Sequence, residues 1–193
     1  MSRRFIIPLL IAVFVSLMLL SCKTTGFGFK GVDVNGMIYD FSNRPVPFCD
    51  VYLGRWRRSS SDINGRFVIS KVPAGTYTIT GNRKGFEEYS GEVTVREKGQ
   101  IIYIRLPSQN QLLNLVDEAL CANNLAMAEE MAERAFQIDP NNIEMLFYYA
   151  AVKFRQRDYK KAMEFVDSAK TLGSRDQYIE RFTSQLKEKV YAN

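Results

Sequence analysis

Between residues 30 and 107, apolar and polar side chains alternate with a period of two. Such alternation gives each β-strand one apolar face, and clusters of Gly, Pro, Asn, Asp and Ser separate the runs as turns do. The apolar positions are Val32, Val34, Gly36 and Ile38, then Cys49, Val51 and Leu53, then Phe67 and Ile69, then Tyr77 and Ile79, then Val93 and Val95, and finally Ile102, Ile104 and Leu106. These six runs and their turns predict an antiparallel sandwich of six or seven strands over residues 30–107, and we expect seven.

After Pro107 the apolar spacing becomes helical, and it repeats with a fixed offset along the chain. At this offset Ala128 aligns with Ala162, and Ala135 aligns with Ala169. Such repetition predicts an α-helical array of two hairpins, over residues 109–142 and 143–176. We expect a further helix over residues 175–191 to cap them. Its expected inward residues are Tyr178, Ile179, Phe182, Leu186 and Val190.

The N-terminus has the organisation of an export signal. Arg3 and Arg4 precede an apolar run from Phe5 to Leu20, and small Ser21 follows it. This run is short for a membrane-spanning helix, which needs about 20 residues. An uncleaved N-terminal anchor remains the alternative, and it would leave the topology almost unchanged.

The segment Leu19-Leu20-Ser21-Cys22 resembles the lipobox of bacterial lipoproteins. The resemblance implies a signal peptide over residues 1–21 and a mature N-terminus at Cys22, which would carry a diacylglycerol thioether and commonly an additional acyl chain such as palmitate. More than one chain is what stable anchoring requires. Residues 22–29 would then be a short lipidated tether. Lys23 weakly favours the outer membrane of the cell envelope over the inner membrane.

Several segments of the first half resemble the carboxypeptidase regulatory-like domain, a transthyretin-like β-sandwich also called peptidase-associated. They are Val34-Asn35-Gly36, Arg44-Pro45-Val46-Pro47, Asp62-Ile63-Asn64-Gly65-Arg66-Phe67, Val72-Pro73-Ala74-Gly75-Thr76-Tyr77 and Lys84-Gly85-Phe86. The resemblance covers nearly all of residues 31–107. Cys49 stands where that family usually has a small Ala, which fits a small buried side chain.

The second half, residues 108–193, resembles two tetratricopeptide repeats plus a capping helix. The spacing of Ala128, Ala135 and Pro140 carries the resemblance. Two departures are Val116, where that family has a small residue, and the absence of Pro after Gly173. Since about three repeats are usually needed for stability, we expect the sandwich to pack against the first helix.

Composition and charge narrow the possible functions. The 193-residue chain contains 26 Lys and Arg, 21 Asp and Glu, and no His. Residues 23–107 carry a formal charge of +5 and residues 108–193 a charge of −2. Neither half is basic enough to require nucleic acid. The lack of His removes the commonest general base and zinc ligand.

Apart from Cys22, we expect Cys49 and Cys121 to be unpaired buried thiols, although export would permit a disulfide.

One candidate surface is the basic, aromatic segment Arg55, Trp56, Arg57 and Arg58, at the end of a predicted strand. It could contact anionic lipid head groups, stack on a sugar or anchor a protein partner. The alternative is a solvated strand end with Trp56 packed over a sheet edge.

The other candidate surface is the concave face that a tetratricopeptide array forms from its first helices. The resemblance places Leu113, Asp117, Leu120, Glu144, Phe147, Ala151, Phe154 and Arg155 on this face. Phe147 and Phe154 would grip a peptide or helix of a partner. The alternative is that the cap or the sandwich covers the face.

These features favour a membrane-anchored, non-catalytic adaptor with envelope protein partners, and a glycan- or head-group-binding module is the alternative. The sequence offers no nucleophile motif or carboxylate pair in a recognisable context, so we expect no enzyme activity. We likewise expect no cofactor, no metal and no nucleic acid.

Overall fold

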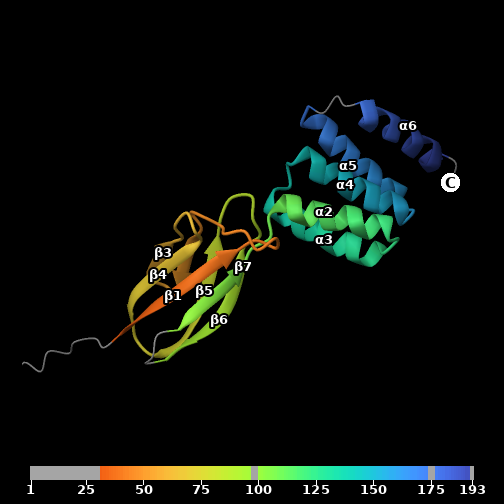
Figure 1. The fold of residues 1–193 in the computed structure, drawn as a ribbon. Helices are drawn as coiled ribbons and strands as arrows, with labels where there is room; N and C mark the ends of the chain where they lie inside the picture. The colour runs from red at the N-terminus through yellow and green to blue at the C-terminus, as the bar shows by residue number, and fades with distance from the viewer. Residues whose placement is uncertain (1–30, 97–99, 174–176, 192–193) are drawn as a thin grey trace, which may run out of the picture. The chain divides into compact units, whose positions relative to one another are not determined.

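The computed structural model describes residues 31–96, 100–173 and 177–191, and the predicted signal peptide, lipobox and tether lie outside them. Gly31–Asn193 forms one compact unit. Within the described ranges, seven strands in two sheets form a β domain, and five helices form a helical domain after it (Figure 1). No helix in these ranges combines the length and apolar character that crossing a membrane requires.

The strands are β1 (Val32–Tyr39), β2 (Asp50–Leu53), β3 (Arg57–Ser60), β4 (Arg66–Val72), β5 (Gly75–Asn82), β6 (Tyr89–Val95) and β7 (Ile101–Arg105). The helices are α2 (Gln109–Cys121), α3 (Leu125–Ile138), α4 (Ile143–Arg155), α5 (Tyr159–Thr171) and α6 (Gln177–Tyr191).

The first sheet has the strand order β4-β1-β7, and the second has the order β3-β2-β5-β6. All neighbouring strands are antiparallel except β1 and β7, which run parallel with Gly36 opposite Ile102. The prediction of a wholly antiparallel β domain is therefore wrong at this pair. A hairpin forces two strands to be antiparallel, but β1 and β7 are the first and last strands and no hairpin joins them.

Strand β3 has no apolar alternation, and the sequence pattern did not predict it. Its four residues are Arg57-Arg58-Ser59-Ser60. They pair antiparallel with β2, with Arg57 opposite Leu53 and Ser60 opposite Asp50. A strand at the edge of a sheet is held by backbone hydrogen bonds on one side and can tolerate polar side chains on both faces. Arg55 to Arg58 therefore form a β2–β3 turn and the start of β3.

The predicted apolar positions of both sheets meet in one buried cluster that includes Val34, Ile38, Leu53 and Ile79. Gly36 faces this core from β1. A Cβ atom at Gly36 would lie 2.0 Å from Cζ of Phe67, whose ring is only 2% exposed. The missing side chain thus makes the space that the Phe67 ring fills, which explains why the alternating apolar run of β1 contains a glycine.

The repeat period of the sequence is also the period of the helices. Helices α2 and α4 begin at residues 109 and 143, and α3 and α5 begin at residues 125 and 159, so each pair is one period apart. The turn before each second helix repeats as well, since Asn123 (φ 55°) and Arg157 (φ 65°) both adopt the left-handed conformation. Asn124 and Asp158 then cap α3 and α5, each accepting a hydrogen bond from a backbone amide three positions later. The structure therefore confirms a helical repeat.

Helix α6, the last described helix, begins at Gln177, one further period after the start of α4. Its buried residues Ile179 and Leu186 pack with the preceding helices, as predicted. Glu180 and Ser184 occupy the positions of buried Leu146 and Ala150 in α4, and both are exposed. No described helix follows to cover these two positions, so they face solvent, where polar side chains are favoured.

One residue of the predicted inward face of α6 is not buried. Val190 is 38% exposed and, with Lys189, lines a shallow hollow of about 240 Å³ beside the start of α5, so its predicted inward position is wrong. It lies in the last turn of α6, where the packed face has ended. The side chain of Tyr178 lies outside the described part of the structure.

Gln109 holds the first repeat together at a point where three helices meet. Its buried Nε2 donates hydrogen bonds to the carbonyl oxygens of Ala135 (2.9 Å) and Asp139 (3.0 Å) at the end of α3. Its Oε1 accepts a hydrogen bond of 2.8 Å from Nδ2 of Asn142, the cap of α4. One amide thereby satisfies carbonyl groups that a helix end leaves without intrahelical partners.

The contact between Gly36 and Phe67 predicts a large effect from a small substitution. Gly36→Ala should lower the free energy of unfolding by at least about 2 kcal/mol, because the added methyl group overlaps the Phe67 ring. Urea denaturation measures this change. Asn35→Ala, on the exposed face of the same strand, should change stability by less than about 0.5 kcal/mol. Adding Phe67→Leu to Gly36→Ala should recover part of the loss, and equal stability of Gly36→Ala and the unchanged protein would contradict the packing described above.

Candidate functional site

The predicted concave-face residues do not form one accessible surface. Leu113 is buried in the helical core at 2% exposure, and Leu120 is half-buried against it. Phe147 and Phe154 of α4 both pack edge-on against Phe182 of α6, with ring centroids 5.5 and 5.3 Å apart. These two rings therefore stabilise the packing of α6, which corresponds to the alternative in which the cap covers the face.

Polar residues of α2 and α4 remain accessible on this side of the helical domain. We call Asp117, Cys121, Glu144, Tyr148 and Arg155 the α2–α4 face; Tyr148 is half-buried and the other four are exposed. Burial raises the pKa of the Tyr148 hydroxyl, and the negative charges of Asp117 and Glu144 raise this pKa further. The phenol is thus within the electrostatic influence of carboxylates on both α2 and α4.

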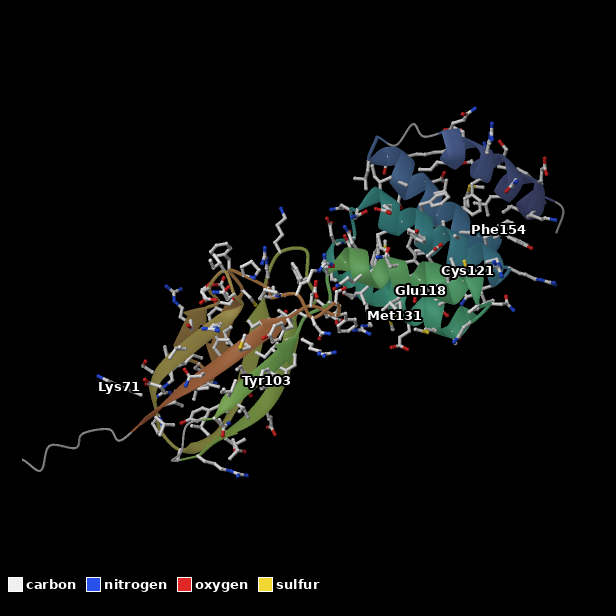
Figure 2. The ribbon with its side chains drawn as sticks, in the orientation of Figure 1. Lys71, Tyr103, Glu118, Cys121, Met131 and Phe154 are labelled. Atoms are coloured by element: carbon white, nitrogen blue, oxygen red, sulfur yellow. The ribbon has the colours of Figure 1, made fainter. Side chains whose placement is uncertain are left out.

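The rest of the α2–α4 face is fixed by the turn between α2 and α3. Nη2 of Arg155 donates a hydrogen bond of 2.9 Å to Oδ1 of Asn123, the left-handed residue of that turn. Cys121 is the last residue of α2, and Phe154 lies on α4 (Figure 2). Ala151 is half-buried. Two carboxylates, a phenol and a guanidinium on rigid helices can bind polar and cationic groups of a peptide.

Sequence reasoning identified Asp117, Glu144 and Arg155 but missed Tyr148 and Cys121. Tyr148 directly follows Phe147 in an aromatic run, Phe147-Tyr148-Tyr149, in which periodicity alone does not identify the outward residue. Tyr149 points the other way and stacks on Phe165, with ring centroids 4.3 Å apart. The sequence signal that could have identified Tyr148 was its place on a first helix of a repeat, near the acidic positions Asp117 and Glu144.

An ion pair between a buried lysine and a partly exposed glutamate supports α4 from the side of α3. Lys153 is 7% exposed and its Nζ binds Oε1 of Glu129, whose other oxygen accepts a hydrogen bond of 2.8 Å from Nε2 of Gln156. The ammonium also lies 5.5 Å from the ring centroid of Tyr149. The hydrogen bond from Lys153 is the main reason that the pKa of Glu129 is lowered. These contacts fix the rotation of α4 and thus hold the α2–α4 face in place.

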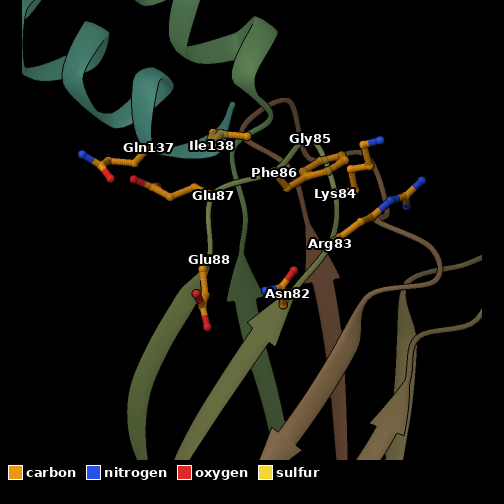
Figure 3. A pocket seen from close by; sticks show the side chains of 9 residues that line it. All are labelled: Asn82, Arg83, Lys84, Gly85, Phe86, Glu87, Glu88, Gln137 and Ile138. Atoms are coloured by element: carbon orange, nitrogen blue, oxygen red, sulfur yellow. The ribbon is translucent and has the colours of Figure 1, made fainter. Parts of the chain in front are cut away.

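The helical domain meets the β domain at a bidentate ion pair. Nε and Nη2 of Arg134 on α3 each lie 2.8 Å from a carboxylate oxygen of Glu87, which precedes β6. Close by is a hollow of about 410 Å³ between residues 82–88 and the end of α3 (Figure 3). Gln137 and Ile138 line it from α3, and Arg83 packs over the Phe86 ring at 5.1 Å. Because Arg134 already occupies the Glu87 carboxylate, the hollow presents no free carboxylate from that residue.

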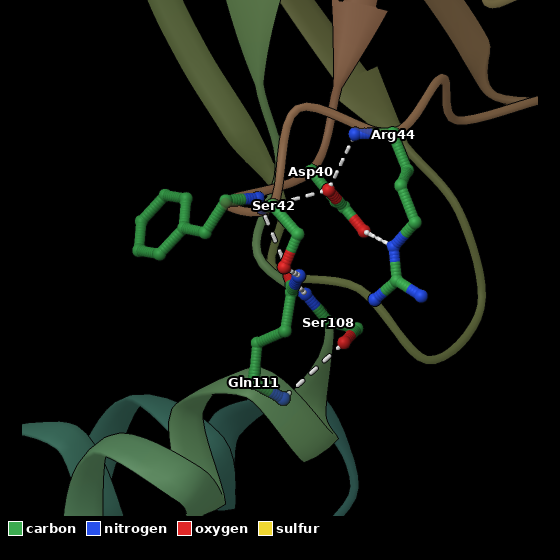
Figure 4. Close-up of polar contacts among 6 residues, drawn as sticks. Asp40, Ser42, Arg44, Ser108 and Gln111 are labelled. Atoms are coloured by element: carbon green, nitrogen blue, oxygen red, sulfur yellow. Dashed lines mark hydrogen bonds and ion pairs between the residues drawn. The ribbon is translucent and has the colours of Figure 1, made fainter.

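A turn after β1 makes the second contact with the helices. Asp40 accepts hydrogen bonds from the backbone amides of Ser42 (2.8 Å) and Arg44 (2.9 Å) and pairs with the Arg44 side chain (Figure 4). Gln111 of α2 donates a hydrogen bond of 2.9 Å to Oγ of Ser42 and accepts one from the amide of Ser108. The expected packing of the β domain against the first helix is thus made by polar contacts.

The basic segment lies at the tip of the β2–β3 hairpin. Trp56 is 88% exposed and does not pack over a sheet edge, and Arg55 and Arg58 are exposed beside it. Arg57 is half-buried and its guanidinium lies 5.9 Å from the centroid of the Tyr77 ring. This segment belongs to the β domain and is separate from the α2–α4 face.

Cys49 and Cys121 are both free, as expected. Cys49 is buried, and burial followed by the charge of Asp50 raises its pKa to about 11. The prediction that Cys121 is buried is wrong, because α2 ends at this residue and its side chain is exposed. Within the ranges that the structure covers, no group of three Cys, Asp or Glu residues could hold a metal ion.

Comparison with known proteins identifies two families in separate parts of the chain. Residues 33–104 match the carboxypeptidase regulatory-like domain, and residues 122–180 match the family described as anaphase-promoting complex, cyclosome, subunit 3. The chain thus has a carboxypeptidase regulatory-like domain followed by a tetratricopeptide-like domain. Among curated proteins there is no significant match.

Three similar solved structures each match part of the chain. One is a C-terminal interface mutant of a type II cohesin–X-dockerin complex from Acetivibrio cellulolyticus, with 22% identity, a TM-score of 0.36 and coverage of 42% of this chain and 61% of that chain. An N-terminal interface mutant of the same complex shows 20% identity, a TM-score of 0.36 and coverage of 46% and 74%. The major pilin subunit of Bacillus cereus shows 12% identity, a TM-score of 0.33 and coverage of 40% and 28%.

The different environments of the two thiols predict selective labelling. A maleimide reagent at pH 7.5 should modify Cys121 in the folded protein within minutes and should leave Cys49 unmodified until urea unfolds the chain, since Cys49 is buried and its pKa is about 11. Peptide mass spectrometry distinguishes the two sites. Rapid modification of Cys49 without denaturant would show that the β domain opens locally.

Proposed function

We propose that this protein is a lipid-anchored lipoprotein of the cell envelope, in the outer membrane, that acts as a non-catalytic adaptor. Cys22 carries the lipid in this proposal, and the α2–α4 face binds an envelope protein partner. The β domain acts as a transthyretin-like sandwich that spaces the helical domain from the anchor, and the helices act as two tetratricopeptide repeats with a cap.

One observation supports the adaptor role most strongly. Asp117, Glu144 and Arg155 lie on the first helices of two successive repeats, and the packing of the helical domain leaves all three exposed. The core uses Leu112, Val116, Leu146 and Ala150 of the same helices instead. Repeat arrays commonly use such outward positions of stacked helices as binding surfaces.

The family matches support the same role. The family that matches residues 122–180 is described as a subunit of a multiprotein complex. Both matched domains are interaction domains without catalytic function. The sequence contains no His, so the usual Ser and Cys triads have no base.

The apolar run Phe5–Leu20 followed by Ser21 and Cys22 supports the proposed lipid anchor. Replacing Cys22 by Ala should abolish incorporation of radioactive palmitate into the protein when it is expressed in a bacterium that processes lipoproteins, because no thiol remains at the lipobox position to accept the diacylglycerol. Ser21→Ala keeps a small residue before the cut and should be labelled normally. Continued labelling of Cys22→Ala would contradict the anchor.

Affinity capture from detergent extracts tests the adaptor role. The unchanged protein should recover a stoichiometric partner, and the double variant Asp117→Ala/Arg155→Ala should recover at least tenfold less, because it removes two charges from the α2–α4 face. The matched control is Lys160→Ala/Asp167→Ala, which removes one exposed charge of each sign from α5.

The control Lys160→Ala/Asp167→Ala should unfold at the same urea concentration as the unchanged protein, since both side chains are exposed. Asp117→Ala/Arg155→Ala should unfold at a slightly lower one, because it also loses the exposed hydrogen bond from Arg155 to Asn123. Equal recovery of the partner by the two variants would place the binding surface elsewhere. Substitution of Phe147 or Phe154 is a poor test, because each ring packs against α6.

A further inference from the structure

The fold gathers four segments at the end of the β domain where β1 begins. Val32 of β1 pairs with Val72 at the end of β4, and Gly75 at the start of β5 pairs with Val95 at the end of β6. The β2–β3 hairpin points its tip the same way, because Leu53 pairs with Ile79 while Asp50 pairs with Asn82 further along β5. Segments far apart in the sequence therefore share one end of the domain (Figure 1).

Tyr77 fixes the hairpin tip to the neighbouring turn. Its hydroxyl donates a hydrogen bond of 3.0 Å to the carbonyl oxygen of Pro73, and its ring lies under the guanidinium of Arg57. Cβ atoms built at Gly54 and Gly75 would lie 3.6 and 3.5 Å from this ring, so both turns pass closely over it. The positions of Arg55 to Arg58 are consequently tied to the β4–β5 turn, and they do not depend on the hairpin alone.

This end of the domain is strongly cationic. Its basic residues come from three different segments, and we call them the basic end: Arg55, Arg57, Arg58, Lys71 and Arg96. Asp33 and Glu92 are the acidic residues in the described part of this end, and one oxygen of Asp33 accepts a hydrogen bond from the Lys71 amide. Lys71 lies close to the start of β1 (Figure 2).

The opposite end of the β domain is balanced. It carries five basic residues, Arg44, Arg66, Arg83, Lys84 and Arg105, and five acidic ones, Asp40, Asp50, Asp62, Glu87 and Glu88. Two of these acidic residues form ion pairs, with Arg44 and with Arg134. At the basic end, by contrast, no ion pair joins any of the five cations to a residue within the described ranges.

We propose that the basic end docks onto an anionic lipid surface, with Trp56 at the level of the head groups. Unpaired Arg and Lys side chains attract anionic head groups, and Trp favours the boundary between apolar and aqueous phases. Gly31 lies at this same end, so residues 1–30, with their apolar run Phe5–Leu20, are attached where the cations are concentrated. The orientation of the chain at a membrane rests on the anchor proposed above, whereas the affinity for anionic lipid does not depend on it.

Trp56 is the only Trp in the sequence, so its fluorescence reports on the basic end alone. A chain of residues 31–193, which is one compact unit with its own cores, should be mixed with vesicles of phosphatidylcholine alone or of phosphatidylcholine and phosphatidylglycerol in equal amounts. The anionic vesicles should shift the Trp56 emission to shorter wavelength and protect it from acrylamide, and about 0.5 M NaCl should reverse both effects. Vesicles without phosphatidylglycerol should produce neither effect.

Matched charge variants locate the binding. The variant Arg55→Ala/Arg58→Ala/Lys71→Ala/Arg96→Ala should bind anionic vesicles at least tenfold more weakly than the unchanged chain. The control Lys84→Ala/Lys160→Ala/Arg181→Ala/Lys187→Ala removes the same number of exposed positive charges elsewhere and should bind within twofold of it. Unfolding in urea checks that both variants remain folded.

Three results would overturn the proposal: unchanged Trp56 emission with anionic vesicles, equal loss of binding in the two variants, or a response to soluble heparin as strong as that to vesicles, which would indicate a general polyanion site. The vesicle experiment uses a chain without Cys22 and contains no protein partner. Its outcome is therefore independent of whether Cys22 is lipidated and of whether the α2–α4 face captures a partner.

Discussion

The short connection between β7 and α2 limits how the two domains can be arranged. The Leu106 amide donates to the Tyr39 carbonyl, the Pro107 carbonyl accepts from the Glu87 amide, and Ser108 both bridges to Phe86 and caps α2. Backbone groups of the connection are thus bonded to the β domain on one side and to the helix on the other. The Glu87–Arg134 pair adds a contact away from the connection, and two separated points of attachment resist rotation better than one. The helical surfaces are therefore presented from a β domain to which they are firmly joined.

Much of this fold follows from spacing in the sequence. The period of two identified every strand except β3, because each of the others carries inward apolar residues such as Val51 and Leu53. The longer period identified the helical repeat because Ala128 and Ala162 occupy equivalent, fully buried positions. Strand β3 was missed because a polar edge strand is specified by its partner's backbone, and the parallel β1–β7 pair was missed because alternation carries no information about direction.

The candidate surface was less predictable than the fold. The family resemblance placed Phe147 and Phe154 outward, yet both rings pack against Phe182, which lies on the last helix of the array. The contacts with α6, and that of Phe154 with Tyr159 of α5, decide this, since an aromatic residue is equally suited to a core and to a binding groove. Tyr148 was missed for the converse reason, because the charge of Asp117 in α2 acts on this α4 residue only in the folded domain.

The parallel pairing of β1 and β7 has a mechanical consequence. The chain enters β1 at one end of the β domain and leaves β7 at the other, and the two strands lie side by side in register from Asn35–Ile101 to Tyr39–Arg105. A pull between Gly31 and α2 would load β1 from its first residue and β7 from its last. Strands pulled in this way must slide past each other, so their hydrogen bonds are strained together, whereas a hairpin pulled from its open ends separates one pair at a time. The β domain is thereby built to carry tension in shear between the proposed anchor and the proposed partner.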